Sequence, residues 1–274
     1  KRRALELLWE RHGPDARFAR WRADQGEELE RYARFCALAE HHGRGWRSWP
    51  AELRRPDAPA VDRFAADHAD RVAFWAWVQH LAADQLRRAE EPVALLTDLA
   101  VGVDPDGADA WALQDLLAEG VSVGAPPDEF NRAGQDWGLP PFVPHALREA
   151  GYAPLASLWR AAMGHGGGVR IDHVMGLFRL FWIPPGGGPE DGAYVRYRAD
   201  ELLAVLAIES ARAGAVVVGE DLGTVEPEVR AALGEAGVLS YRLVWFEGAP
   251  PEEWPAQALA AVTTHDLPTV AGVW

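Results

Sequence analysis

The chain contains 274 residues, of which 49% are hydrophobic and 25% are charged, and this balance indicates a globular rather than a disordered protein. Its formal net charge of −14, from 27 basic and 41 acidic residues, argues against nucleic acid as the main partner, because phosphate binding needs a clustered basic surface. Cys36 is the single cysteine, which excludes an internal disulfide framework, and no apolar run approaches the roughly 18 residues of a membrane-spanning helix.

The first ninety residues are predicted to be helical. The opening Lys1-Arg2-Arg3 shows no initiator methionine and no signal-peptide pattern, so we expect an interior segment of a longer, cytoplasmic protein. Apolar residues recur at helical spacing over 17–42 and again over 62–88, and each stretch predicts one helix. Proline and glycine interrupt the pattern at 43–59. We therefore expect residues 1–91 to form a helical insertion or subdomain.

Strands and helices alternate in the rest of the chain, which predicts a parallel sheet with right-handed crossovers. Helices are predicted at 144–163 and 199–213, with loops over 104–131 and irregular sequence over 134–141. The predicted strands are 93–98, 169–172, 215–220, 241–246 and 260–264. A complete barrel of this type needs eight strands. The expected fold class is therefore α/β, an incomplete TIM-type (β/α)8 barrel with helical insertions that lacks the first strands and the last. Residues 92–274 would form this partial catalytic barrel, with an inserted active-site loop near 104–141.

Three of the predicted strands run into carboxylates, at Asp172, at Glu220 and at Asp266. Isolated carboxylates are costly to bury, so three of them at buried strand ends indicate one shared polar site. Retaining cleavage of a glycosidic bond needs two carboxyl groups about 5–5.5 Å apart. Asp172 suits the nucleophile and Glu220 the acid/base, while Asp266 would hold sugar hydroxyls. The sequence therefore favours an enzyme that acts on sugar chains.

The residues beside these carboxylates support that interpretation. Arg170 lies two residues before Asp172, so it points to the same side of the strand and would keep that carboxylate ionised. His173 and His265 adjoin acids and could hydrogen-bond sugar hydroxyls. The three glycines at 166–168 are expected to form a loop before the strand, and they do not match a phosphate loop because no Gly-Lys-Ser/Thr follows.

Interpretations without a catalytic role stay open for the same residues. Asp172 could be only a structural partner of Arg170, the segment 220–223 a helix-capping turn, and His265-Asp266 an ordinary turn. Two His-Asp neighbours could also supply metal ligands, although the sequence contains no HxxxH pattern and no Cys/His cluster.

Several motifs together resemble one family. The segments VRIDHVMG at 169–176, GEDLGTV at 219–225 and THDLP at 264–268 are similar to the three active-site motifs of 4-alpha-glucanotransferases. These are the amylomaltases, glycoside hydrolase family seventy-seven, within the alpha-amylase clan. VGAPPDEFN at 123–131, followed by GQDWG at 134–138, resembles the loop peculiar to that family. With matches at 98–103 and 109–111, the resemblance covers almost the whole chain.

The resemblance implies a role for each candidate residue. Asp172 would be the nucleophile that forms a covalent glucosyl-enzyme, Glu220 the general acid/base and Asp266 the transition-state stabiliser. Further residues would bind substrate: Arg170, His173 and His265 around the donor sugar, Gln135 and Trp137 on the loop over the glucans, and Asp98 and Asn131 as additional candidates. The chain departs from many members at Val174-Met175, where they have Phe-Arg.

The implied activity is retaining transglycosylation, in which glucosyl units move between alpha-1,4-glucans by double displacement. Its partners would be alpha-1,4-glucans and maltooligosaccharides, without nucleic acid or membrane, and it needs no cofactor or metal because acid/base and nucleophile chemistry suffices. An alpha-glucan hydrolase of the same clan and a truncated glucan-binding fragment without activity are the alternatives. Exclusion of water and a well-held acceptor favour transfer over hydrolysis.

Overall fold

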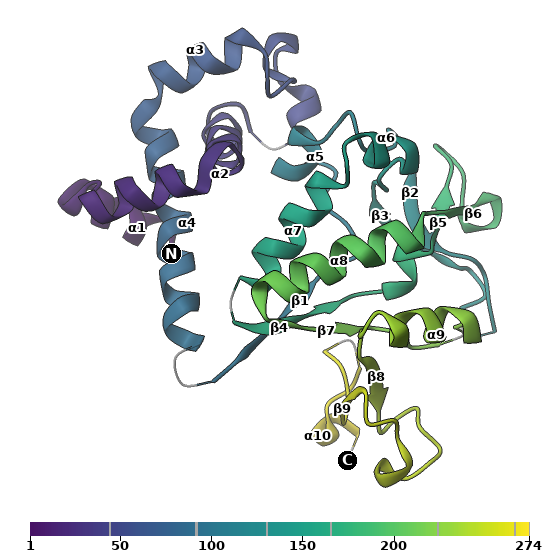
Figure 1. The fold of residues 1–274 in the computed structure, drawn as a ribbon. Helices are drawn as coiled ribbons and strands as arrows, with labels where there is room; N and C mark the ends of the chain where they lie inside the picture. The colour runs from purple at the N-terminus through teal and green to yellow at the C-terminus, as the bar shows by residue number, and fades with distance from the viewer. Residues whose placement is uncertain are drawn as a thin grey trace. The chain divides into compact units, whose positions relative to one another are not determined.

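The computed structural model describes residues 1–43, 45–90, 93–129, 131–164, 166–223, 225–265 and 267–273 (Figure 1). The chain divides into two compact units. The first consists of Lys1–Ala89, Gly102–Ser122 and Trp137–Phe142, and the second of Glu90–Val101, Val123–Asp136 and Val143–Trp274. Among the helices of the described part, none is long and apolar enough to cross a bilayer.

The first unit is built mainly of helices. They are α1 (Arg2–His12), α2 (Ala16–His42), α3 (Pro59–Asp67), α4 (Ala69–Glu90) and α5 (Ala108–Ala112), with 3-10 turns η1 (Trp46–Ser48) and η2 (Ala51–Leu53). The helix predicted over 17–42 is confirmed only in part as α2, because Gly26 (φ 67°, ψ −151°) is not helical and kinks the element. Its N-cap Asp15 accepts a hydrogen bond from the backbone N–H of Phe18. The single helix predicted over 62–88 is wrong, because the chain breaks at His68 between α3 and α4. The apolar stripe continues across this break, so periodicity does not reveal it.

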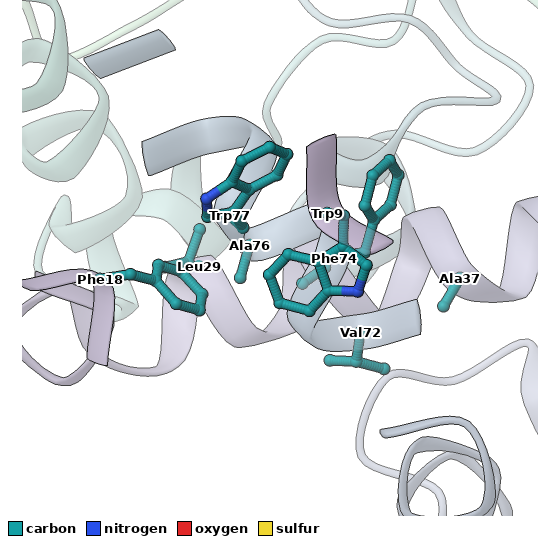
Figure 2. Packing of buried hydrophobic residues seen from close by; sticks show 9 residues of the cluster. Trp9, Phe18, Leu29, Ala37, Val72, Phe74, Ala76 and Trp77 are labelled. Carbon is teal, nitrogen blue, oxygen red and sulfur yellow. The ribbon is translucent and has the colours of Figure 1, made fainter. Parts of the chain in front are cut away.

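Aromatic side chains fill the core of the helical unit. The rings of Trp9 and Phe18 meet edge to face, with centroids 6.3 Å apart, and Trp9 also contacts Phe74 and Trp77 (Figure 2). Edge-to-face contacts of this kind add to the free energy of burying the rings. A second cluster is made of Phe35, Leu38, Trp46, Trp49, Leu53, Val61 and Trp111.

A parallel sheet of three strands lies at the centre of the second unit (Figure 1). Its order is β1 (Leu95–Leu99), β4 (Gly166–Ile171) and β7 (Val216–Gly219), and its register places Asp98 opposite Arg170 and Arg170 opposite Val218. Two helices, α7 (Ala153–Met163) and α8 (Ala199–Ala213), pack together, and α7 covers one face of the sheet. The Thr97 hydroxyl donates to the carbonyl of Ala162 at 2.7 Å, which fixes β1 to α7.

Glycines allow the three strands to approach one another. The loop expected at 166–168 is wrong, because these residues begin β4. A Cβ atom on Gly167 would lie 2.0 Å from the carbonyl oxygen of Leu95 in β1, and one on Gly168 would lie 2.3 Å from that of Val216 in β7. The glycine run is therefore a requirement of strand packing, which a local reading of turn residues does not detect.

Two further parallel strands follow, β8 (Ser240–Leu243) and β9 (Ala258–Ala261). A bridge between Val218 and Leu239 joins the first of them to β7, and α9 (Pro227–Glu235) lies between these strands in the sequence. The short elements η5 (Pro251–Glu253) and α10 (Val270–Val273) occur after β8. All five predicted strands are present at least in part, and parallel pairing is confirmed for β1-β4-β7 and for β8-β9. The strand predicted over 241–246 ends at Leu243, and the strand predicted over 260–264 begins earlier and ends at Ala261.

A separate sheet of four strands corrects other expectations. Its order is β3 (Gln135–Leu139), β2 (Ser122–Ala125), β5 (Arg179–Ile183) and β6 (Ala193–Arg196), with η3 (Val174–Leu177) and η4 (Pro189–Asp191) flanking β5. β5 and β6 are antiparallel, so the expectation of parallel strands alone is wrong. The segment over 134–141, expected to be irregular, contains β3. β3 can lie close to β2 because Gly124 of β2 has no side chain. A Cβ atom on Gly124 would lie 2.0 Å from the Gln135 carbonyl oxygen in β3.

The helix predictions in this half of the chain had mixed outcomes. The helix predicted over 199–213 is confirmed as α8, which ends at Gly214 in the left-handed conformation (φ 62°, ψ 27°). The helix predicted over 144–163 is instead two helices, α6 (Pro144–Glu149) and α7. Positive φ angles at Gly151 and Tyr152 separate them, and a non-glycine residue in this conformation is not signalled by composition.

Candidate active site

Four candidate residues meet at the carboxyl end of the three-stranded sheet. Asp98 lies near the end of β1, Arg170 lies in β4, Asp172 directly follows β4, and Glu220 directly follows β7. The backbone N–H of Asp172 donates to the Leu99 carbonyl at 3.0 Å, and that of Glu220 donates to the Ile171 carbonyl at 2.9 Å. The ladder of backbone hydrogen bonds thus continues past the strand ends and fixes both carboxylate-bearing residues.

Arg170 joins two of these carboxylates. Its side chain is buried, and it donates from Nη1 to Asp98 Oδ1 at 2.6 Å, while Nη2 lies 2.9 Å from Asp172 Oδ1. Burial lowers the pKa of Arg170, but the hydrogen bond and charge of Asp98 and the charge of Asp172 outweigh it, so the pKa is raised above its usual value. The Asp172 side chain remains 40% exposed, so a substrate can still reach the carboxylate that the arginine orients.

Glu220 sits in an environment that favours its protonated form. Burial raises the pKa of this carboxyl, hydrogen bonds from the backbone N–H groups of Leu222 and His173 lower it, and the charge of Asp172 raises it, with a net increase. The N–H of His173 donates to Oε2 at 3.0 Å and that of Leu222 donates to Oε1 at 2.8 Å. Helix α9 has Glu226 as its N-cap, so Glu220 does not cap that helix. A carboxyl with a raised pKa beside a carboxylate is the arrangement that general acid/base catalysis requires.

The two histidines approach the same cluster. His173 adopts a left-handed backbone conformation with φ 47°, a strained state typical of functional turns, and burial lowers the pKa of its imidazole. His265 Nδ1 lies 3.7 Å from Asp98 Oδ2, and its side chain is 67% exposed. Asp266, the third predicted carboxylate, lies outside the described residues. Within the residues that are described, no three His, Cys, Asp or Glu side chains are grouped to hold a metal ion.

The remaining candidates lie in strand β3 or in the turn before it. Gln135 and Trp137 are part of β3, and Asn131 precedes that strand in a turn where its N–H donates to Asp128 Oδ1. The structure thus places Gln135 and Trp137 in the four-stranded sheet and Asn131 just before it. Their roles in substrate binding stay predictions.

Two residues that the sequence analysis does not single out contact this cluster or support it. The ring centroid of Tyr241 in β8 lies 5.4 Å from Arg170 Cζ, and the buried carboxylate of Asp221 accepts the Tyr241 N–H. The sequence does indicate a supporting position for Asp221. It directly follows Glu220, and consecutive residues of an extended chain point to opposite sides, so its side chain is expected to point away from that of Glu220. Nothing in the sequence alone marks Tyr241 as a neighbour of Arg170.

Comparison with known proteins identifies relatives over the whole chain. The family model described as 4-alpha-glucanotransferase, glycoside hydrolase family seventy-seven, matches residues 1–274. A 4-alpha-glucanotransferase of Mycobacterium tuberculosis is 48% identical over 292 residues, which cover 99% of this chain and 40% of that protein. One from Haemophilus influenzae is 38% identical over 278 residues, which cover 94% of this chain and 40% of that protein.

A solved structure agrees with the sequence relatives. The crystal structure of amylomaltase from Corynebacterium glutamicum matches with a TM-score of 0.82 and 38% identity, over 98% of this chain and 39% of that one. The chain thus spans about two fifths of the length of these relatives, and it shares a mixed α/β fold with an amylomaltase. These findings confirm the resemblance of the motifs, and the chain belongs to the 4-alpha-glucanotransferase family, glycoside hydrolase family seventy-seven.

Proposed function

We propose that the protein carrying this chain is a 4-alpha-glucanotransferase that moves glucosyl units between alpha-1,4-glucans, including maltooligosaccharides. One observation carries the proposal beyond family membership. Asp172 is exposed and paired with a buried arginine, while Glu220, fixed beside it by the His173 N–H, has a raised pKa. An accessible carboxylate oriented by an arginine and a second carboxyl whose pKa is raised by burial are the two groups that retaining glycoside chemistry requires.

In the first step, the Asp172 carboxylate attacks the anomeric carbon of the donor glucan. The bond from that carbon to the glycosidic oxygen breaks, and Glu220 gives its proton to the departing oxygen. In the second step, a hydroxyl of the acceptor glucan attacks the glucosyl-Asp172 ester and Glu220 accepts the hydroxyl proton. Two displacements at one carbon retain its configuration, and Asp172 and Glu220 return to their starting states.

The neighbouring residues complete the proposed site. Arg170 holds Asp172 and Asp98 in place. His173 and His265 are proposed from the family motif to hydrogen-bond the donor sugar, and the 3.7 Å approach of His265 Nδ1 to Asp98 supports this for His265. The role of Asp266 as transition-state stabiliser is proposed from the family motif. The roles of Gln135, Trp137 and Asn131 in binding glucans are proposed on the same ground.

We also propose that residues 92–274 form part of a (β/α)8 barrel that lacks the first strands and the last. An active-site loop would be inserted near 104–141, and residues 1–91 would form a helical subdomain. The parallel order β1-β4-β7, the parallel pair β8-β9 and the meeting of polar residues at strand carboxyl ends support the barrel. The coverage of 40% of the relatives' length supports its being partial. A cytoplasmic location stays a prediction from the sequence.

The first prediction concerns Asp172. We expect the protein carrying this chain to convert maltotriose into a ladder of longer glucans plus glucose, and Asp172→Asn to abolish the ladder because no covalent intermediate can form. Chromatography of the products measures this, and circular dichroism checks folding. Asp57→Asn, at an exposed side chain in the helical unit, is the matched control and keeps the ladder. Glucose and maltose alone would indicate a hydrolase, and binding without products would indicate a glucan-binding protein; either result contradicts the proposed transferase.

A further inference from the structure

We propose that Tyr241 is a positioning residue for Asp172 and acts through Arg170. The inference rests on the proposed function, because it takes Asp172 as the nucleophile. The ring centroid of Tyr241 lies 5.4 Å from Arg170 Cζ, within the distance at which an aromatic face attracts a guanidinium. Both residues are only 7% exposed, so water screens this attraction weakly.

The hydrogen bonds of Arg170 leave one side of the guanidinium to the ring. Nη1 and Nη2 are engaged by Asp98 and Asp172, whereas Nε is buried and has no hydrogen-bond partner within the described part of the chain. A buried cation normally needs satisfaction of all its donors. The aromatic face is the contact that compensates for the unsatisfied Nε and keeps the guanidinium from moving away from Asp172.

Tyr241 is itself held in place by the residue next to Glu220. Asp221 is buried, its Oδ1 accepts the Tyr241 N–H at 2.9 Å, and its Oδ2 accepts the Ser240 hydroxyl at 2.6 Å. Arg230 Nε, 3.5 Å from Oδ2, balances the negative charge. Glu220 and Asp221 therefore have different roles. Glu220 is held beside His173, the residue after the nucleophile, and Asp221 fixes the strand that carries the Tyr241 ring.

The geometry connects the ring to the rate of reaction. With the ring present, Arg170 already lies closer to Asp98, at 2.6 Å, than to Asp172, at 2.9 Å, so on loss of the ring the carboxylate of the nucleophile should lose its orienting partner first. Catalytic groups must be held within about 0.5 Å of the productive position. Loss of the ring should therefore reduce kcat, while substrate binding should stay nearly unchanged because the ring is buried against Arg170.

The experiment compares Tyr241→Phe, which keeps the ring, with Tyr241→Leu, which removes it, in the protein carrying this chain. We expect Tyr241→Phe to stay within about twofold of the parent in kcat. For Tyr241→Leu we expect a loss of about tenfold in kcat, with KM changed less than about twofold, the scale of a desolvated cation–π contact. In an Arg170→Gln background, which has no cation, Tyr241→Leu should cost less than about twofold further, because the contact is already lost. Multiplicative losses in the double variant would mean independent structural roles and would overturn the proposal.

A second measurement does not depend on activity. The Arg170 Nε–H resonance is assigned in a proton–nitrogen NMR spectrum by its disappearance in Arg170→Lys. Ring current should shift this signal upfield in the parent and in Tyr241→Phe, and the shift should vanish in Tyr241→Leu. Tyr241→Met replaces the leucine variant if that one does not fold. An unchanged Arg170 signal overturns the positioning role whatever the products are, whereas a parent without transfer products overturns only the proposed transferase.

Discussion

Opposing influences act on the proton affinity of Glu220. Burial and the charge of Asp172 raise the pKa of this carboxyl, while two backbone N–H groups lower it. The same N–H of His173 that lowers the pKa also positions the carboxyl beside the residue following the nucleophile, at 3.0 Å. The His173 N–H thus affects both the position and the pKa of Glu220, whereas the charge of Asp172 affects the pKa and can be removed by substitution.

The residue-scale prediction is a pH dependence. A general acid works only while protonated, so kcat/KM should fall as pH rises through the raised pKa of Glu220. Carbon-13 NMR of the glutamate carboxyls, with Glu220 assigned by Glu220→Gln, measures that pKa directly. Asp172→Asn removes one of the raising charges and should lower the pKa of Glu220, although burial, the largest cause, keeps it above the usual range.

The exposed Glu228 supplies the control for this titration. Glu228→Gln should leave both the pH profile and the Glu220 resonance unchanged. If Glu220 titrates in the ordinary carboxyl range, or if Asp172→Asn does not move it, the two groups are not coupled in the way that the site geometry implies.

At the scale of elements, the close approach of β1 and β4 brings the site together. Asp98 and Arg170 are opposite residues of these two strands, and their contact depends on the glycine run at the start of β4. A side chain at this run would push the strands apart at one end and change the register that pairs the two residues.

Gly167→Ala should therefore lower both stability and transfer. Its Cβ would lie 2.0 Å from the Leu95 carbonyl oxygen, so backbone must move, at a cost of about 1–3 kcal/mol. Urea denaturation and maltotriose transfer measure the two effects. Gly234→Ala, on α9 with open space around it, is the matched control and should be neutral or slightly stabilising. Equal midpoints for the two variants would contradict the packing argument.

The sequence predicts part of this arrangement, for physical reasons that particular residues make clear. Because side chains two residues apart on a strand point to the same side, the sequence predicts that Arg170 and Asp172 lie together. The contact between their side chains confirms this prediction. The cation–π partner Tyr241 lies 71 residues away in the chain, and the bridge between Val218 of β7 and Leu239, just before β8, brings it toward Arg170. The antiparallel strands β5 and β6 also escape prediction, because Pro and Gly between them resemble a linker.

At the scale of the whole molecule, one face of the central sheet is polar at one end and apolar at the other. Thr97 faces α7, so its neighbours Leu96 and Asp98 face the opposite side. Leu96, Gly168 and Val216 form one register row across the sheet on that side. Leu96 is 43% and Val216 is 48% exposed, and in a closed barrel this face would be the packed interior.

The barrel proposal predicts that Leu96 and Val216 contribute little to the stability of the 274-residue chain and more to that of the longer protein. Leu96→Ser and Val216→Ser should change the urea midpoint of the 274-residue chain little, because water already reaches both positions. In the longer protein that the proposal implies, each should cost about 1.5–3 kcal/mol, the value of burying such a side chain. Val217→Ser, at a buried position on the helix-facing side, should destabilise both proteins and controls for the substitution itself. Equal, small effects of Leu96→Ser in the two proteins would mean that nothing covers this face, and the sheet would then not be part of a closed barrel.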